Sequence, residues 1–174
     1  MAGADAVRYD IIADTHGDLS KELLAALEGA DVIVHAGDCC SISDYECLRQ
    51  FCRVVMCVGN NDWGIDYGPE VKRLTRAFMS GMRWQVCHYE DQLDLETCDI
   101  AICGHTHRPF VRKDGNVLVM NPGSPPSPRT RQGPPMGRIV IADNQVQSAK
   151  IIQLEPERGE SKRKRLFGGL GNFF

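Results

Sequence analysis

The feature that most constrains the fold of this chain is a series of short, almost continuous apolar runs. They cover residues 9–13, 32–34, 54–58 and 100–103, and all of them contain valine, isoleucine or both. Apolar runs of this length, without strict alternation of polar residues, are typical of strands that are covered on both faces. We therefore predict a buried sheet whose early strands are parallel.

Helical patterns separate the first three of these runs. Leucines recur at helical spacing across residues 19–27, with Asp18 as the expected N-cap and Gly29 as the stop. A second helix is predicted over residues 43–51. Strands that alternate with helices indicate right-handed βαβ units in the first third of the chain.

The second half of the chain shows the turn chemistry of antiparallel hairpins. Three pairs of strand-like segments flank turn signals: 75–79 with 83–88, 110–113 with 117–120, and 137–142 with 146–154. Residues 122–137 are rich in proline and glycine and are predicted to form a loop. The expected fold class is α/β, with sheet pairing that is parallel early and mixed or antiparallel late.

A chain of 174 residues fits one domain and can bury a full hydrophobic core. We assign residues 1–156 to this domain. Residues 157–174 join four consecutive basic residues to a stretch containing glycine and phenylalanine. This composition predicts a solvated tail, with a docking element as the alternative.

Charge and hydropathy exclude several classes of partner. The net charge of −3 gives no general attraction to nucleic acid or anionic lipid, so a phosphate-bearing ligand would need a local site. No apolar run approaches the roughly 18 residues of a membrane span, and the first residues lack a signal-peptide pattern. We expect a cytoplasmic protein that binds neither membranes nor nucleic acid.

Each apolar run is followed by residue types that bind metal ions. In chain order these residues are Asp14, His16, Asp38, Asn60, His88, His105 and His107. Residues just beyond the carboxyl ends of strands in an open α/β sheet meet in one crevice, and Gly37, Gly59 and Gly104 allow tight turns there. Seven ligands are too many for one tetrahedral ion but suit two ions that share a carboxylate.

In order and spacing these residues resemble the calcineurin-like metallophosphoesterase superfamily. The resemblance rests on Asp14-x-His16, Gly37-Asp38, Gly59-Asn60, His88 and Gly104-His105-x-His107, and it covers about residues 8–154. The short chain and residues 121–124 resemble its small bacterial and archaeal phosphodiesterase branch. The resemblance implies a four-layer α/β/β/α sandwich with mixed sheets and a dinuclear metal centre.

The resemblance also implies how the two ions are held. Asp14, His16, Asp38 and His107 would bind one ion, and Asp38, Asn60, His88 and His105 the other, with Asp38 bridging. The implied activity is hydrolysis of phosphodiester bonds by a metal-bridging hydroxide, with Asn60 and His105 among the catalytic groups. Carboxylate, amide and imidazole ligands favour Mn²⁺, while Fe²⁺, Zn²⁺ and Ni²⁺ remain open.

One departure from the family pattern concerns the leaving group. Many relatives have a histidine after Gly-Asn, where this chain has Asn61, which cannot supply a proton at neutral pH. We therefore expect activated leaving groups to be hydrolysed better than unactivated alkoxides. Asp62 is included with the catalytic residues as a group that orients a neighbour, and Asn61 and Arg129 are the expected substrate contacts.

The remaining histidine and the cysteines receive structural interpretations. His35 is read as a buried histidine with a backbone partner, and support of the metal ligands is the alternative. Eight cysteines without a Cys-x-x-Cys pair indicate reduced, mostly buried thiols. Cys39 and Cys40 are assigned to packing in a turn, with metal binding as the alternative.

Three functional hypotheses remain open on the sequence alone. The first is hydrolysis of a small phosphodiester or nucleotide-like substrate. The second is a phosphomonoesterase or nucleotide pyrophosphatase with the same centre. The third is a non-catalytic protein-binding scaffold of the same fold, as in a retromer subunit that resembles these enzymes. A homo-oligomer is also left open.

Overall fold

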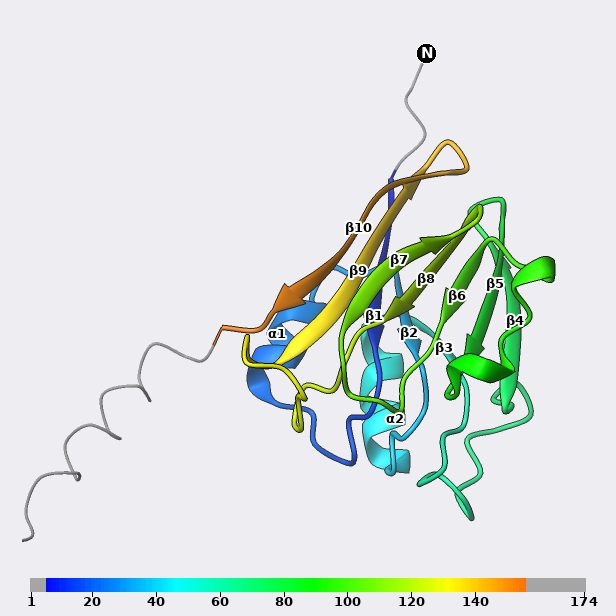
Figure 1. Cartoon of the computed structure of the whole chain (residues 1–174). Coiled ribbons are helices and arrows are strands. Elements are labelled where there is room, and N and C mark those ends of the chain that lie inside the picture. Colours follow the sequence, from blue (N-terminus) through cyan, green and yellow to red (C-terminus); the bar gives the residue numbers. More distant parts are fainter. Residues whose placement is uncertain (1–5, 156–174) are drawn as a thin grey trace, which may run out of the picture.

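The computed structural model describes residues 6–155, which form two five-stranded sheets packed face to face (Figure 1). The strand order is β10-β9-β1-β2-β3 in the first sheet and β4-β5-β6-β8-β7 in the second. Both sheets mix parallel and antiparallel pairs, so the predicted mixed-sheet α/β sandwich is confirmed. The tail assigned to residues 157–174 lies outside the described residues.

The first sheet contains the predicted βαβ units. Its strands are β1 (Val7–Ile12), β2 (Val32–His35), β3 (Arg53–Met56), β9 (Pro135–Ala142) and β10 (Gln145–Gln153). The first three are parallel neighbours, and β9 and β10 add an antiparallel hairpin beyond β1. The three early strands therefore end at the same edge of the sheet.

Two helices cover the outer face of the first sheet (Figure 1). They are α1 (Lys21–Leu27) and α2 (Ile42–Phe51), each close to its predicted position. The predicted N-cap of the first helix is wrong: Ser20, not Asp18, accepts the hydrogen bond from Leu23 N. The helix begins at Lys21, so Ser20 directly precedes it, whereas Asp18 lies two residues earlier, where its N–H closes a turn on the carbonyl of Thr15 at 2.9 Å.

The second sheet carries two of the predicted hairpins. Its strands are β4 (Leu74–Met79), β5 (Met82–Cys87), β6 (Ile100–Ile102), β7 (Phe110–Asp114) and β8 (Val117–Asn121). The central strands are parallel, and the two outer strands return antiparallel. Its outer face packs against two short 3₁₀ helices, η1 (Glu90–Gln92) and η2 (Leu95–Thr97), so this layer is thinner than the α-helical one.

The main core lies between the sheets and contains buried apolar side chains from both. The rings of Tyr9 and Trp84 lie 4.7 Å apart across the interface. The sheets approach so closely that a Cβ on Gly137 of β9 would lie 2.4 Å from Sδ of Met120 on β8. All eight cysteines, which lie between residues 39 and 103, are free, and five of them are buried.

The predicted loop over residues 122–137 is too long by three residues. Strand β9 begins at Pro135, which pairs with Gln153 of β10. Proline is tolerated at the first residue of a strand because its missing N–H is not needed there. Within residues 6–155, no helix is long and apolar enough to cross a membrane.

A buried carboxylate ties the first sheet to α1. Asp10 is fully buried and accepts two hydrogen bonds from Arg138, at 2.6 and 3.1 Å, and two from Arg8, at 3.2 and 2.6 Å. Both guanidinium groups also donate to the carbonyl of Ala26, and Arg8 reaches the carbonyl of Glu28. Asp10 thus positions two cations at the C-terminal end of α1, where unpaired carbonyls favour positive charge.

We expect Asp10→Ala to lower the free energy of unfolding by about 3 kcal/mol, because both arginines lose their buried partner. Urea unfolding of the purified variant measures this change. Glu46→Ala is the matched control, since its ion pair with Arg49 is half exposed and should contribute less than about 1 kcal/mol. Equal losses in the two variants would contradict the assigned role of Asp10.

Candidate metal centre

The carboxyl ends of five strands deliver the predicted ligands to one place. Strands β1, β2, β3, β5 and β6 are each followed, within a few residues, by one or two of them. Two groups of three side chains have ligand atoms that all lie within 4.8 Å of one another. These groups are Asp14, His16 and His107, and Asp14, Asp38 and His88.

The first group surrounds one oxygen of Asp14. Its Oδ1 lies 3.4 Å from Nε2 of His107 and 4.0 Å from Nε2 of His16. The two imidazoles face each other, with 3.3 Å between their Nε2 atoms. Nδ1 of His107 lies 2.9 Å from the carbonyl of Ser127, and this hydrogen bond leaves the Nε2 lone pair directed at the centre.

The second group joins the remaining ligands to the first. Nε2 of His88 lies 3.8 Å from Asp14 Oδ1, 3.5 Å from Asp38 Oδ2 and 3.0 Å from Asn60 Oδ1. Asn60 Oδ1 is in turn 3.1 Å from Nδ1 of His105. All seven predicted ligands therefore form one continuous network. In this arrangement the carboxylate common to both groups is that of Asp14, so bridging by Asp38 stays a prediction.

The chemistry of the donor set fits divalent cations. Asp14 Oδ1 is buried and, among the described residues, has no hydrogen-bond partner. Burial, followed by the charge of Asp38, raises the pKa of Asp14 to about 8, although the His105 N–H and the charge of Arg129 oppose this rise. Burial also lowers the pKa of His88 and His107, which favours the neutral imidazoles that metals require.

The backbone at the site is strained. Five of the seven ligands have positive φ angles between 49° and 66°: Asp14, His16, Asp38, His105 and His107. Left-handed conformations of non-glycine residues are costly and concentrate at functional sites. Gly59 allows the close approach of these loops, because a Cβ there would lie 2.1 Å from Oδ1 of Asp38.

Asp62 holds the site loops in place. Its carboxylate accepts hydrogen bonds from the backbone N–H groups of Asp38, Cys40 and Gly59, each at 2.7 Å, and from the hydroxyl of Tyr67 at 2.9 Å. Burial favours a higher pKa, but these hydrogen bonds outweigh it and lower the pKa of Asp62. The carboxylate is therefore ionised and fully occupied, which agrees with an orienting role rather than with contact to a substrate.

The two predicted substrate contacts lie at the rim of the centre. Asn61 donates from its backbone N and its Nδ2 to the two oxygens of Asp38, at 2.8 and 2.6 Å. Arg129 is exposed, and its backbone N donates to the carbonyl of His107 at 3.0 Å. The amide of Asn61 is thus committed to Asp38, whereas the guanidinium of Arg129 stays accessible beside His105 and Thr106.

His35 and the cysteine pair lie behind the ligands. His35 is fully buried, accepts from Gly37 N, and has its Nε2 2.9 Å from Oγ1 of Thr15. Burial lowers the pKa of His35 to about 4, so it is a neutral histidine with a backbone partner. Cys39 is buried, while Cys40 places Sγ 3.7 Å from Nδ1 of His16. Burial raises the pKa of both thiols.

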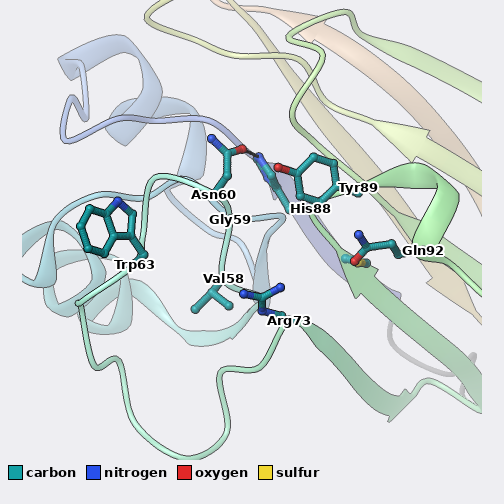
Figure 2. Close-up of a pocket in the computed structure, with 9 residues that line it drawn as sticks. Val58, Gly59, Asn60, Trp63, Arg73, His88, Tyr89 and Gln92 are labelled. Carbon is teal, nitrogen blue, oxygen red and sulfur yellow. Dashed lines mark hydrogen bonds between the residues drawn. The ribbon is translucent and has the colours of Figure 1, made fainter.

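Sequence reasoning missed two neighbours of the ligands. Tyr89 packs against His105, with ring centroids 4.5 Å apart, and lies next to His88 in Figure 2. Ser124 is fully buried and donates its hydroxyl to the carbonyl of Asp14 at 2.7 Å. Ser124 belongs to residues 121–124, which are part of the family resemblance but have no role assigned by it. No sequence pattern marks Tyr89.

Comparisons with known proteins agree with this geometry. A model of the calcineurin-like phosphoesterase superfamily domain matches residues 8–144. A "probable metallophosphoesterase" of Methanothermobacter thermautotrophicus is 30% identical over 159 residues, covering 82% of this chain and 90% of the relative. "Phosphodiesterase MJ0936" of Methanocaldococcus jannaschii is 26% identical over 140 residues, covering 67% and 83%.

Solved structures show the same fold. Vacuolar protein sorting 29 of Cryptosporidium parvum superposes with a TM-score of 0.67 at 17% identity, covering 85% of this chain and 98% of that one. The fold, the family match and a group of side chains that could hold a metal ion together indicate the metallophosphoesterase class of phosphoester hydrolases. The chain belongs to the calcineurin-like phosphoesterase superfamily.

We expect the affinity for Zn²⁺ to rise with pH. Below the usual pKa of 3.8, Asp14 is protonated in both folded and unfolded chains. Between 3.8 and about 8 only the folded, metal-free chain keeps the proton, so its stability falls as pH rises, and a cation must displace that proton. One released proton corresponds to about tenfold tighter binding per pH unit below 8. Competition titrations between pH 6 and 8 measure this slope, and a flat profile would contradict it.

Proposed function

We propose that this protein hydrolyses phosphodiester bonds at a dinuclear metal centre. The observation that carries the proposal is the single network of seven ligand-type side chains around the buried, unpaired Asp14 Oδ1. Asp14, His16, Asp38 and His107 would hold one ion, and Asp38, Asn60, His88 and His105 the other. When bound, two such ions lower the pKa of a coordinated water and neutralise charge on a phosphoryl group.

The chain itself holds several of these ligands in fixed orientations. The carbonyl of Ala36 lies 2.8 Å from Nδ1 of His88, so the Nε2 of that ring faces the centre in the required tautomer. Asp62 fixes the loops that carry Asp38 and Asn60 through its three backbone hydrogen bonds. These contacts limit rearrangement of the site during the reaction.

An open groove on the His105 side supports an anionic substrate. It has a volume of about 530 Å³ and is lined by Glu90, His105, Thr106, Arg108, Phe110 and Arg129. The negative charge of Glu90 is matched by its ion pair with Arg112. Arg108 and Arg129 therefore give the groove a positive charge, and guanidinium groups match phosphate oxygens in a bidentate fork.

The positive charge of Arg108 and Arg129 also supports a second candidate function. This is phosphomonoesterase or nucleotide pyrophosphatase activity at the same centre. A monoester carries an additional negative charge, which Arg108 and Arg129 would neutralise beside the centre. Relative rates on an aryl diester and the corresponding aryl monoester separate the two candidates. The likeness to vacuolar protein sorting 29 concerns the fold, and retention of all seven ligand types favours hydrolysis over a purely scaffolding role.

Removal of metal is the direct test of the proposal. We expect the purified protein to contain divalent metal by elemental analysis, and to lose its activity on bis(p-nitrophenyl) phosphate after chelation. Added Mn²⁺, Fe²⁺, Zn²⁺ or Ni²⁺ should restore the activity to different extents. Activity that survives complete removal of metal would refute the proposal.

A ligand variant tests the same proposal within the chain. Asn60→Ala removes an amide ligand and should lower kcat/KM at least about tenfold, together with the bound metal content. Asn116→Ala is the matched control, because it removes an equally exposed amide from the β7–β8 turn. Similar losses in the two variants would show that the effect is not specific to the centre.

A histidine at position 61 should restore protonation of the leaving group. We expect Asn61→His to accelerate hydrolysis of an alkyl diester about tenfold or more, while the rate on a p-nitrophenyl diester changes little. Only the variant should lose activity on the alkyl diester as pH rises above the pKa of a histidine. Equal acceleration of both substrates would contradict the claim that the wild type lacks a proton donor at this position. The same loss of activity at alkaline pH in the wild type would contradict it too.

A further inference from the structure

A second cavity adjoins the metal centre and shares no lining residue with the groove that contains Arg108 and Arg129. It has a volume of about 230 Å³, and Figure 2 shows the side chains around it. Its lining includes Asn60 and His88, two of the expected metal ligands, together with Trp63, Arg73, Tyr89 and Gln92. A group bound in this cavity would therefore be attached to, or adjacent to, the phosphoryl group at the centre.

Two aromatic side chains flank the cavity. Trp63 is 85% exposed, so the face of its indole ring is open for a planar group to stack on it. In Figure 2, Trp63 and Tyr89 lie on opposite sides of the cavity. Trp63 directly follows Asp62, whose four hydrogen bonds fix the turn, so the backbone that carries the indole is held in place before a ligand arrives.

Polar groups complete the lining. Within residues 6–155, no ion pair or hydrogen bond engages the guanidinium of Arg73. Sγ of Cys87 lies 3.8 Å from Oε1 of Gln92, so the amide N–H groups of Gln92 remain available to a ligand. A planar aromatic wall with one amide and one guanidinium is suited to a ring system that carries carbonyl and amino groups.

We propose that this cavity binds the nucleobase of a nucleotide diester, with the base stacked on Trp63 and its polar edge directed to Arg73 and Gln92. The inference rests on the proposed function, because the phosphoryl group of that nucleotide would occupy the adjacent centre. Stacking on an aromatic side chain tolerates any base. The cavity should therefore bind all nucleobases and discriminate little among them.

Calorimetric titration with uridine monophosphate and with ribose 5-phosphate tests the proposal, since ribose 5-phosphate carries an anomeric hydroxyl in place of the base. The titrations use the full chain, both after chelation and with added Zn²⁺. We expect uridine monophosphate to bind at least about tenfold more tightly than ribose 5-phosphate. Trp63→Ala should remove most of this preference, and Trp63→Phe should retain most of it.

Phe78→Ala is the matched control, because Phe78 is another exposed aromatic residue, 71% accessible on β4, and does not line the cavity. It should leave the preference unchanged. Equal affinity for the two ligands, or a preference that Trp63→Ala does not reduce, would overturn the inference. A base preference without diester hydrolysis would refute the proposed function alone, and hydrolysis without a base preference would refute this inference alone.

Discussion

The site depends on one buried carboxylate oxygen that forms no hydrogen bond within the described part of the chain, Oδ1 of Asp14. A buried acceptor without a partner costs about 1–3 kcal/mol, and more when it carries charge. The neighbouring imidazoles of His88 and His107 direct lone pairs, not N–H groups, toward the same space. A divalent cation would satisfy all of these atoms together.

The surrounding structure maintains this unfavourable arrangement. Five ligands adopt left-handed backbone conformations, which persist only where neighbouring contacts over-determine them. Asp62 supplies such contacts through three backbone N–H groups, and Ser124 fixes the carbonyl of Asp14 from the other side. The close packing of the two sheets at Gly137 gives these loops a rigid base. The packing of the two sheets and these hydrogen bonds thus offset the backbone strain of the ligand residues.

Much of this arrangement could be predicted from the sequence because it follows from the short apolar runs that form the buried strands. Apolar runs located the parallel strands, and residues after their carboxyl ends had to share one edge, so the ligand set followed. Contacts between distant segments could not be predicted in the same way. Examples are the four donors to Asp62, the stacking of Tyr89 on His105 and the exposure of Trp63. All three depend on loop conformation, which the pattern of apolar residues does not reveal. The N-cap at Ser20 was not predicted because Asp18 is an equally good capping residue, and the sequence does not show which of the two directly precedes the first helical turn.

The ligands come from both halves of the sandwich. Asp14, His16, Asp38 and Asn60 follow strands of the first sheet, whereas His88, His105 and His107 follow strands of the second. A cation held by both sets acts as a cross-link at the seam, and its binding free energy adds to the stability of the whole domain. A variant of this chain that could not hold the cation would lose this cross-link between the two sheets. It would need new apolar contacts or a protein partner there to keep the two halves together.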